Sequence, residues 1–160
     1  MNIEWFTLET KISSGLIYTL CFMPPWGSIN SMSEDPQGKK ILLVEDDDAL
    51  ASVYTMRLKG EGFVVTRVAN GEDALAAAKE HKPDLILLDA MMPKVSGFDV
   101  LDILRNTPET ANLKIIMLTA LSQETDKQRA QGLGVDDYLV KSQVVISDVV
   151  DRIKYHLGLS

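Results

Sequence analysis

The chain has 160 residues, 46% of them hydrophobic and 24% charged, a composition that fits one folded domain and excludes wholesale disorder. Its formal net charge is −7 and no basic run is present, which argues against nucleic acid as a direct partner. Cys21 is the only cysteine, and His81 and His156 lie far apart in sequence, so neither an internal disulfide nor a transition-metal site is expected.

Residues 1–38 do not follow the alternating pattern of the rest of the chain. Their longest apolar run, Leu16–Trp26, is about half the ~20 residues of a membrane-spanning helix. Glu4 precedes the first positive charge, which is unlike a signal peptide. We therefore expect an N-terminal extension: an upstream start that is not used, with Met32 as initiator, or a disordered or interaction tail. Residues 39–158 are expected to form one cytoplasmic domain.

Two strand–helix units open this domain. Lys40–Glu45 is a continuous apolar run, as expected of a strand covered on both faces. A helix is predicted from about Asp48 to Gly60, with apolar residues at helical spacing. Phe63–Val68 is rich in β-branched residues and predicts a second strand. The alanine-rich segment Gly71–His81 predicts a helix that ends before a proline.

The third and fourth units repeat this alternation. Asp84–Leu88 predicts a strand, and a helix is expected near Phe98–Arg105. Leu113–Leu118 is again a buried-strand pattern, followed by a helix from about Gln123 to Gln131. Each strand is short and each helix is long enough to cross over the sheet, which is the pattern of parallel strands.

The fifth unit consists of a short strand, Asp137–Val140, and a final helix that ends near Leu157, with Ser147 expected as its N-cap. Five strands that alternate with helices predict a parallel sheet with helices on both faces and right-handed crossovers. In such sheets the functional site lies beyond the carboxyl ends of the strands. The residues that end the strands are therefore the candidates for chemistry.

Polar side chains end four of the predicted strands. Glu45 and Asp46 follow the first, Asp89 follows the third, Thr119 follows the fourth and Lys141 follows the fifth. A solvated acidic loop would explain any one of them alone, but their convergence at one end of a sheet favours a site. Crowded carboxylates raise each other's pKa unless a cation neutralises them. An all-oxygen set without histidine or cysteine suits Mg²⁺.

A carboxylate held beside such an ion can attack phosphorus and form an acyl phosphate. In this interpretation the metal and Lys141 offset the charge of the transferred group, and the Thr119 hydroxyl donates to a phosphoryl oxygen. The strand ends therefore indicate phosphoryl transfer to the protein itself.

Four segments carry a family resemblance: LLVEDD, LILLDAMMPKVSG, IIMLTA and GVDDYLVK. Together they closely resemble the receiver domain of bacterial response regulators, over about Lys39 to Gly158. The resemblance implies a flavodoxin-like, doubly wound (βα)5 sheet with strand order 2-1-3-4-5. It also implies a two-component signalling protein that is phosphorylated on aspartate and is not a turnover enzyme.

The same resemblance assigns the acceptor and metal positions. Asp89 would be the phosphoacceptor, and Asp46 would bind Mg²⁺ directly. Glu45 would act on the ion through water, and the main-chain carbonyl of Met91 would be a further metal contact. Thr119 and Lys141 would bind the phosphoryl group.

Signalling roles follow from the resemblance as well. Thr119 would couple phosphorylation to Tyr138, the aromatic switch residue, although Tyr138 could equally be an ordinary core-edge aromatic. The expected donor is a sensor histidine kinase or phosphotransfer protein. Since the sequence given ends about one helix after Lys141, output is expected through partner binding or relay. The surface of the fourth helix, fifth strand and fifth helix would bind that partner.

Other residues near the strand ends have structural interpretations. Asp47 and Asp48 are expected to favour the N-terminus of the first helix. Pro93 and Gly97 indicate a loop that separates Asp89 from the next helix. Ser142 replaces the proline that usually follows the lysine in this family through a cis bond, which predicts a different path for this loop.

One alternative to a phosphorylated switch remains, a docking module, and two enzyme or nucleotide-binding interpretations fail on the sequence. A docking module with the same fold could work without phosphate, and phosphate uptake would distinguish it. Phosphatases that use an attacking aspartate on a similar sheet need a second aspartate where this chain has Met91. Nucleotide-binding relatives need a glycine-rich first turn, which is EDDD here.

Overall fold

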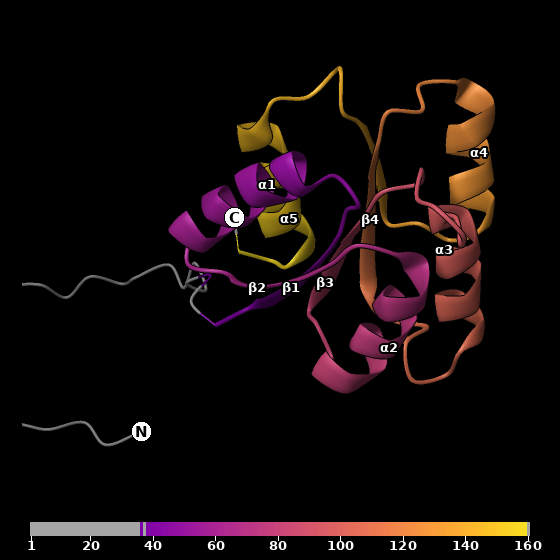
Figure 1. Ribbon diagram of the computed structural model, residues 1–160, viewed down its shortest axis with the longest axis horizontal. Coiled ribbons are helices and arrows are strands. Elements are labelled where there is room, and N and C mark those ends of the chain that lie inside the picture. The colour runs from indigo at the N-terminus through magenta and orange to yellow at the C-terminus, as the bar shows by residue number, and fades with distance from the viewer. Residues whose placement is uncertain (1–35, 37, 160) are drawn as a thin grey trace, which may run out of the picture. The chain divides into compact units, whose positions relative to one another are not determined.

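The computed structural model describes residue 36 and residues 38–159, so the extension expected over residues 1–38 lies almost wholly outside the described residues. The described chain forms one five-stranded sheet and five helices (Figure 1). The strands are β1 (Lys40–Val44), β2 (Val64–Val68), β3 (Leu85–Leu88), β4 (Lys114–Thr119) and β5 (Asp137–Val140). The helices are α1 (Asp48–Gly60), α2 (Gly71–His81), α3 (Gly97–Asn106), α4 (Glu124–Gly132) and α5 (Ile146–His156).

The sheet is parallel throughout, in the order β2-β1-β3-β4-β5. This confirms the predicted flavodoxin-like topology. Strands β1, β2 and β3 end level with one another, with Val44 opposite both Val68 and Leu88. Leu88 lies opposite Met117, so β4 extends two residues further, to Thr119. Strand order reverses at β1, which places its carboxyl end beside that of β3.

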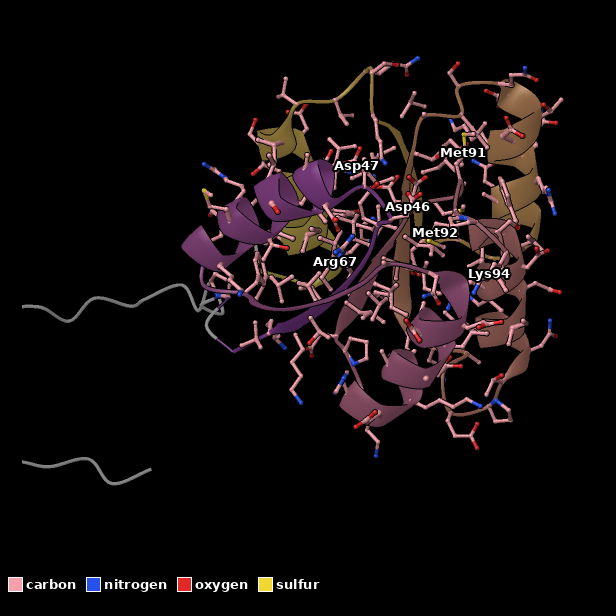
Figure 2. All side chains as sticks on the ribbon, viewed as in Figure 1. Asp46, Asp47, Arg67, Met91, Met92 and Lys94 are labelled. Atoms are coloured by element: carbon pink, nitrogen blue, oxygen red, sulfur yellow. The ribbon has the colours of Figure 1, made fainter. Side chains whose placement is uncertain are left out.

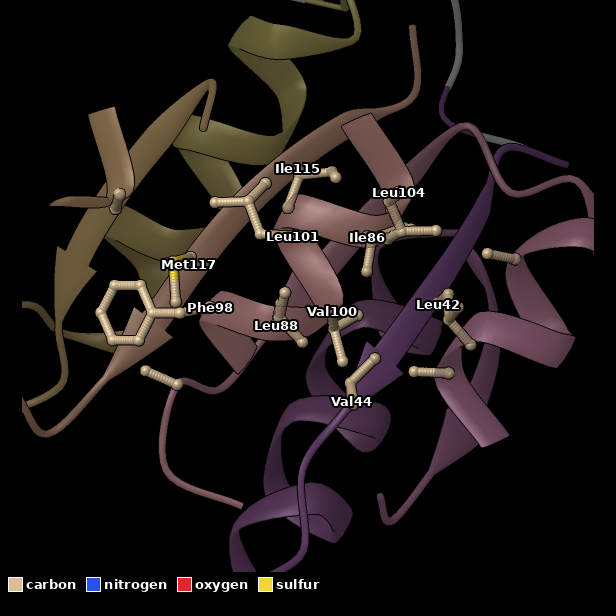
Figure 3. Packing of buried hydrophobic residues seen from close by; sticks show 14 of the residues in the cluster. Leu42, Val44, Ile86, Leu88, Phe98, Val100, Leu101, Leu104, Ile115 and Met117 are labelled. Atoms are coloured by element: carbon tan, nitrogen blue, oxygen red, sulfur yellow. The ribbon is translucent and has the colours of Figure 1, made fainter. Parts of the chain in front are cut away.

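Alternate residues of the central strands face two separate cores, as the two-residue period of a strand requires. Leu42 and Ile86 face the core under α2, α3 and α4, shown in Figure 3. Leu43 and Leu87 face the core under α1 and α5. Figure 1 shows these two helix layers on opposite sides of the strands. The continuous apolar runs of the sequence therefore supply both layers at once.

The buried face of α1 is narrower than the row of apolar residues at helical spacing that the sequence predicts. Ala51 and Leu58 are its buried residues, and Tyr54 packs against them at the edge of the core. Leu50 and Val53, which share the helical spacing, are exposed. The small Ala51 lets the helix approach the sheet closely, so the contact is narrower than an apolar count suggests.

The N-cap predicted for the last helix was wrong. Helix α5 begins at Ile146 with Val145 as its N-cap, and Ser147 lies inside the first turn. The Asp148 carboxylate accepts a hydrogen bond of 3.0 Å from the Val145 N–H. A carboxylate at the third residue after the N-cap can accept from the free N–H of the cap residue. The helix therefore starts one residue before Ser147, nearer the N-terminus than predicted. Asp47, by contrast, caps α1, because its carboxylate accepts from the Leu50 N–H at 2.9 Å.

Candidate functional site

The polar residues that end the strands come together at one end of the sheet. The ammonium of Lys141 lies 2.6 Å from Asp89 Oδ2 and 2.7 Å from Glu45 Oε2. Glu45 and Asp89 are only 2% and 5% exposed, so this cation bridges two carboxylates that have little access to water. A buried carboxylate pair is costly unless a positive charge separates the two groups.

Electrostatic effects in this cluster oppose one another. Burial of the ammonium is the largest single effect and opposes its charge, but the hydrogen bonds to Asp89 and Glu45, together with their negative charges, outweigh it and raise the pKa of Lys141. Burial also raises the pKa of Glu45, and the bond to Lys141 offsets it only in part. Lys141 is therefore held as a cation, while Glu45 still lacks part of the positive charge that would match its burial.

A divalent cation would supply that charge. Carboxylate oxygens of Glu45, Asp46 and Asp89 all lie within 4.8 Å of one another, with Asp46 exposed on the solvent side. The set contains oxygen donors alone, which is the preference of Mg²⁺. Figure 2 labels Asp46 and Met91 at this end of the sheet. These residues fit a magnesium ion.

The main chain after β3 wraps closely around Asp89. Asp89 Oδ1 accepts a hydrogen bond of 3.0 Å from the Met91 N–H, while the Met91 side chain is 55% exposed. A Cβ atom on Gly97 would lie only 2.1 Å from the Asp89 carbonyl oxygen and 2.7 Å from Ala90 Cα. Sequence patterns indicate only loop shaping for Gly97, whereas the structure places its Cα close to the main chain of Asp89 and Ala90.

Thr119 and Tyr138 meet at Leu121. Thr119 is fully buried, and its hydroxyl oxygen accepts from the Leu121 N–H at 3.3 Å. The Tyr138 hydroxyl donates to the Leu121 carbonyl at 3.0 Å. Burial, followed by the charges of Asp126 and Asp89, raises the pKa of Tyr138, so its hydroxyl stays protonated and can donate. One residue of the β4–α4 loop thus contacts both predicted switch residues.

The segment after Lys141 turns without a cis bond. No cis peptide is present within residues 38–159, so the bond to Ser142 is trans. The Gln143 N–H donates to the Val140 carbonyl at 2.8 Å and closes a turn before α5. Lys141 keeps its position because its own N–H bonds the Thr119 carbonyl at 2.8 Å.

Arg67 is a site neighbour that the sequence patterns do not single out. It lies on β2, and its guanidinium donates to the main-chain carbonyls of Glu45 and Asp46. One arginine in a predicted strand carries no sign of such contacts, because register and side-chain direction decide them.

In the described part of the chain, no helix has the length and apolar character needed to cross a bilayer.

A parallel α/β sheet that brings three carboxylates, a buried hydroxyl and a lysine to its carboxyl edge defines a phosphoacceptor signalling domain. The family model described as the response regulator receiver domain matches residues 41–154. The chain belongs to the response regulator receiver domain family.

Known relatives agree with this assignment. The phosphate regulon transcriptional regulatory protein PhoB of Rhizobium meliloti is 44% identical over 102 residues, which are 64% of this chain and 45% of that protein. The chain thus spans less than half the length of the curated relatives it matches.

Solved structures show the same fold. The receiver domain of the Francisella response regulator 1452 has a TM-score of 0.70 at 29% identity, covering 75% of this chain and 97% of that one. The receiver domain of the sensor histidine kinase PA1611 from Pseudomonas aeruginosa has a TM-score of 0.69 at 30% identity, covering 76% and 98%. That structure holds a magnesium ion coordinated in its active-site cleft.

Proposed function

We propose that this receiver accepts a phosphoryl group on Asp89, in a magnesium-dependent reaction, from a histidine kinase or phosphotransfer protein. The observation that carries the proposal is the contact of Lys141 with both Asp89 and Glu45, beside the exposed Asp46. A lysine and a cation pocket on one buried aspartate suit a site that handles additional negative charge.

The residues divide the work as follows. An Asp89 carboxylate oxygen attacks phosphorus, the bond to the donor nitrogen breaks, and the donor imidazole leaves. The Lys141 ammonium, which contacts the Asp89 carboxylate before the reaction, would then neutralise the phosphoryl oxygens. The Thr119 hydroxyl would donate to one of these oxygens. Both groups lie at strand ends near Asp89, so they are on the side of the acceptor that the phosphoryl group would enter.

Glu45, Asp46, Asp89 and the main-chain carbonyl of Met91 would hold the ion, with Glu45 acting through water. Bound Mg²⁺ would lower the repulsion between the incoming phosphoryl group and the carboxylates. Asp46 is the exposed member of the set, which suits a direct ligand that an arriving ion meets first.

The signalling output is proposed to start at Thr119 and Tyr138. A phosphoryl group that draws the Thr119 hydroxyl toward Asp89 would change its contact with Leu121, whose carbonyl also holds Tyr138. The surface of α4, β5 and α5 would then bind a downstream protein or pass the phosphoryl group onward. The expected location is the cytoplasm, where ATP-fed kinases act.

A phosphate-independent docking module is the alternative. Acetyl phosphate with Mg²⁺ separates the two functions, because it phosphorylates a competent acceptor without any kinase. Incorporation that depends on Mg²⁺ and is acid-stable but labile to hydroxylamine, as an acyl phosphate is, supports the proposal. No incorporation at any Mg²⁺ concentration would leave only the docking function.

Replacement of Asp46 by alanine should weaken Mg²⁺ binding more than replacement of Glu45. A direct ligand contributes more to metal affinity than a residue that acts through water. Isothermal titration of each variant with Mg²⁺, without a phosphoryl donor, measures the difference. Asp151→Ala, on the outer face of α5, is the control for loss of an acidic charge. Equal affinities of the two site variants would contradict the assignment, and weaker binding in the Glu45 variant would show that the two roles are reversed.

The phosphorylated protein should be long-lived for a receiver. Hydrolysis needs a water lined up behind phosphorus, and the two residues that flank this path by family resemblance are Met91 and Leu121, which cannot orient water. The variant Met91→Asn/Leu121→Glu should therefore lose phosphate severalfold faster, with Mg²⁺ affinity roughly unchanged. Radiolabel decay checks this, with Met56→Asn on exposed α1 as control. An unchanged decay rate of the double variant contradicts the prediction.

A further inference from the structure

Arg67 makes an unusual set of contacts with the acidic loop that follows β1. Its Nε and Nη2 atoms donate to the Glu45 carbonyl at 3.1 and 3.0 Å, and Nη2 also donates to the Asp46 carbonyl at 3.2 Å. Its Nη1 atom lies 2.7 Å from Asp48 Oδ1. One guanidinium therefore contacts two successive carbonyls of the loop that carries the proposed metal ligands and the first residue of the helix that follows it. Figure 2 labels both Arg67 and Asp46.

The carbonyls of Glu45 and Asp46 lie beyond the last paired residue of β1 and do not take part in the sheet hydrogen bonds. The last paired residue of β1 is Val44, which lies opposite Val68 and Leu88. The Glu45 N–H still bonds the Val68 carbonyl at 3.1 Å, but the strand then leaves the sheet. Among the described residues, the Arg67 side chain is the hydrogen-bond donor to the carbonyls of Glu45 and Asp46. Arg67 thus extends the order of the sheet into the loop.

The geometry requires arginine. A planar guanidinium presents several donors in a fixed fork, so it can bind two neighbouring carbonyls and a carboxylate at the same time. The single ammonium of a lysine has the same charge but cannot span these three acceptors in one orientation. Fixing these two carbonyls fixes the peptide planes on both sides of Asp46, and the bond from the Glu45 N–H to Val68 fixes the plane before Glu45. The directions in which the Glu45 and Asp46 side chains leave the main chain are set by these planes.

We infer that Arg67 is a positioning residue that presets the carboxylates of Glu45 and Asp46 for Mg²⁺. This inference rests on the proposed magnesium-dependent phosphorylation and deepens it. An ion that binds a preset pair does not have to order the loop, so Arg67 raises Mg²⁺ affinity without touching the metal or the phosphoryl group.

The positive charge of Arg67 would by itself repel Mg²⁺ and lower its affinity, which is opposite to the effect of positioning the loop. Two substitutions distinguish the effect of the charge from the effect of the contacts. The guanidinium faces main-chain oxygens and is paired with the Asp48 carboxylate. Arg67→Lys keeps the charge and removes the fork, so weaker Mg²⁺ binding in this variant reports geometry. Arg67→Gln removes the charge, which by itself would tighten Mg²⁺ binding.

The chain contains a matched control. Arg105 on α3 donates to the carbonyls of Gly134 at 2.8 Å, Ala111 at 3.1 Å and Leu113 at 2.8 Å, and pairs with Asp136 at 2.8 Å. It is the same kind of main-chain clamp, but it lies at the opposite end of the strands from the acidic cluster. Arg105→Lys should therefore lower the melting temperature at least as much as Arg67→Lys and leave Mg²⁺ binding unchanged.

Mg²⁺ titration calorimetry and thermal denaturation without metal, on the full chain and each variant, test the inference. We expect the Kd for Mg²⁺ to rise about tenfold in Arg67→Lys, to rise also in Arg67→Gln, and to stay within about twofold in Arg105→Lys. With acetyl phosphate, the Mg²⁺ concentration for half-maximal labelling should rise in Arg67→Lys, while the maximal rate at saturating Mg²⁺ is kept.

Unchanged Mg²⁺ affinity in Arg67→Lys, or equal weakening in the Arg67 and Arg105 variants, would overturn the inference and leave the proposed function standing. An unaltered protein that binds no Mg²⁺ would instead overturn the proposed function. If Arg67→Lys does not fold, Arg67→Gln decides: tighter Mg²⁺ binding in that variant shows that only the charge of Arg67 matters and overturns the inference.

Discussion

Asp89→Asn is expected to abolish phosphate incorporation while the domain stays folded. The amide has the shape of the carboxylate but is not a nucleophile, so the acyl phosphate cannot form. The fold should persist because Lys141 keeps its 2.7 Å contact with Glu45 and the amide oxygen can still accept from the Met91 N–H. Labelling with acetyl phosphate and Mg²⁺, followed by intact-mass measurement, checks the loss.

Asp151→Asn is the matched control, since it makes the same chemical change on the exposed face of α5. It should incorporate phosphate at the rate of the unaltered chain. Circular dichroism should give the same spectrum for all three proteins. Phosphate on Asp89→Asn at the usual yield would mean that another residue is the acceptor.

Gly97→Ala is expected to cost at least about 2 kcal/mol of stability and to remove phosphate uptake. The added Cβ would lie 2.1 Å from the Asp89 carbonyl oxygen and 2.7 Å from Ala90 Cα. Both are main-chain atoms, which cannot rotate away as a side chain can. The backbone around Asp89 would have to shift, and the acceptor would leave the position from which it contacts Lys141.

Gly132→Ala gives the comparison for this change. A Cβ there would meet nothing within 4 Å, and the residue lies at the end of α4. Alanine should therefore leave stability unchanged or raise it by about 0.5–1 kcal/mol. Chemical denaturation of both variants measures the difference. A Gly97→Ala protein as stable and as readily labelled as Gly132→Ala would contradict the close packing around Asp89.

Much of this fold can be predicted from the sequence, because the buried strands are apolar on both faces and stand out from the helices. The predicted boundaries of β1 and β3 differ from those observed by a single residue, and α1 agrees at both ends. Helix α5 was harder, since its start depends on the Asp148 carboxylate and not on the serine that resembles an N-cap. The exposed Val53 was not predicted either, because helical spacing does not give the width of the buried face.

The candidate site could be predicted for a related reason. Residues that follow parallel strands meet at one edge, so Glu45, Asp89 and Lys141 could be brought together from their positions in the chain alone. Two kinds of feature could not be predicted in this way: contacts that a long side chain makes across the sheet, and close approaches of main chain that depend on the absence of a side chain. Arg67 reaches the loop after β1 through the register of β2, and Gly97 matters because of the atoms that a Cβ would meet.

The position of Lys141 at the end of β5 has a consequence for how the site can fail. β5 is an edge strand of four residues, paired with β4 alone and buried at only one position, whereas β1 and β3 are interior strands. Short, half-exposed edge elements open with a smaller free energy than the centre of a domain. When β5 opens, Glu45 and Asp89 are left as neighbouring buried carboxylates without the cation that separates them. Under the proposed function, the population of molecules competent for phosphorylation is therefore set by the local stability of the sheet edge, and a molecule loses this competence while most of its hydrogen bonds remain intact.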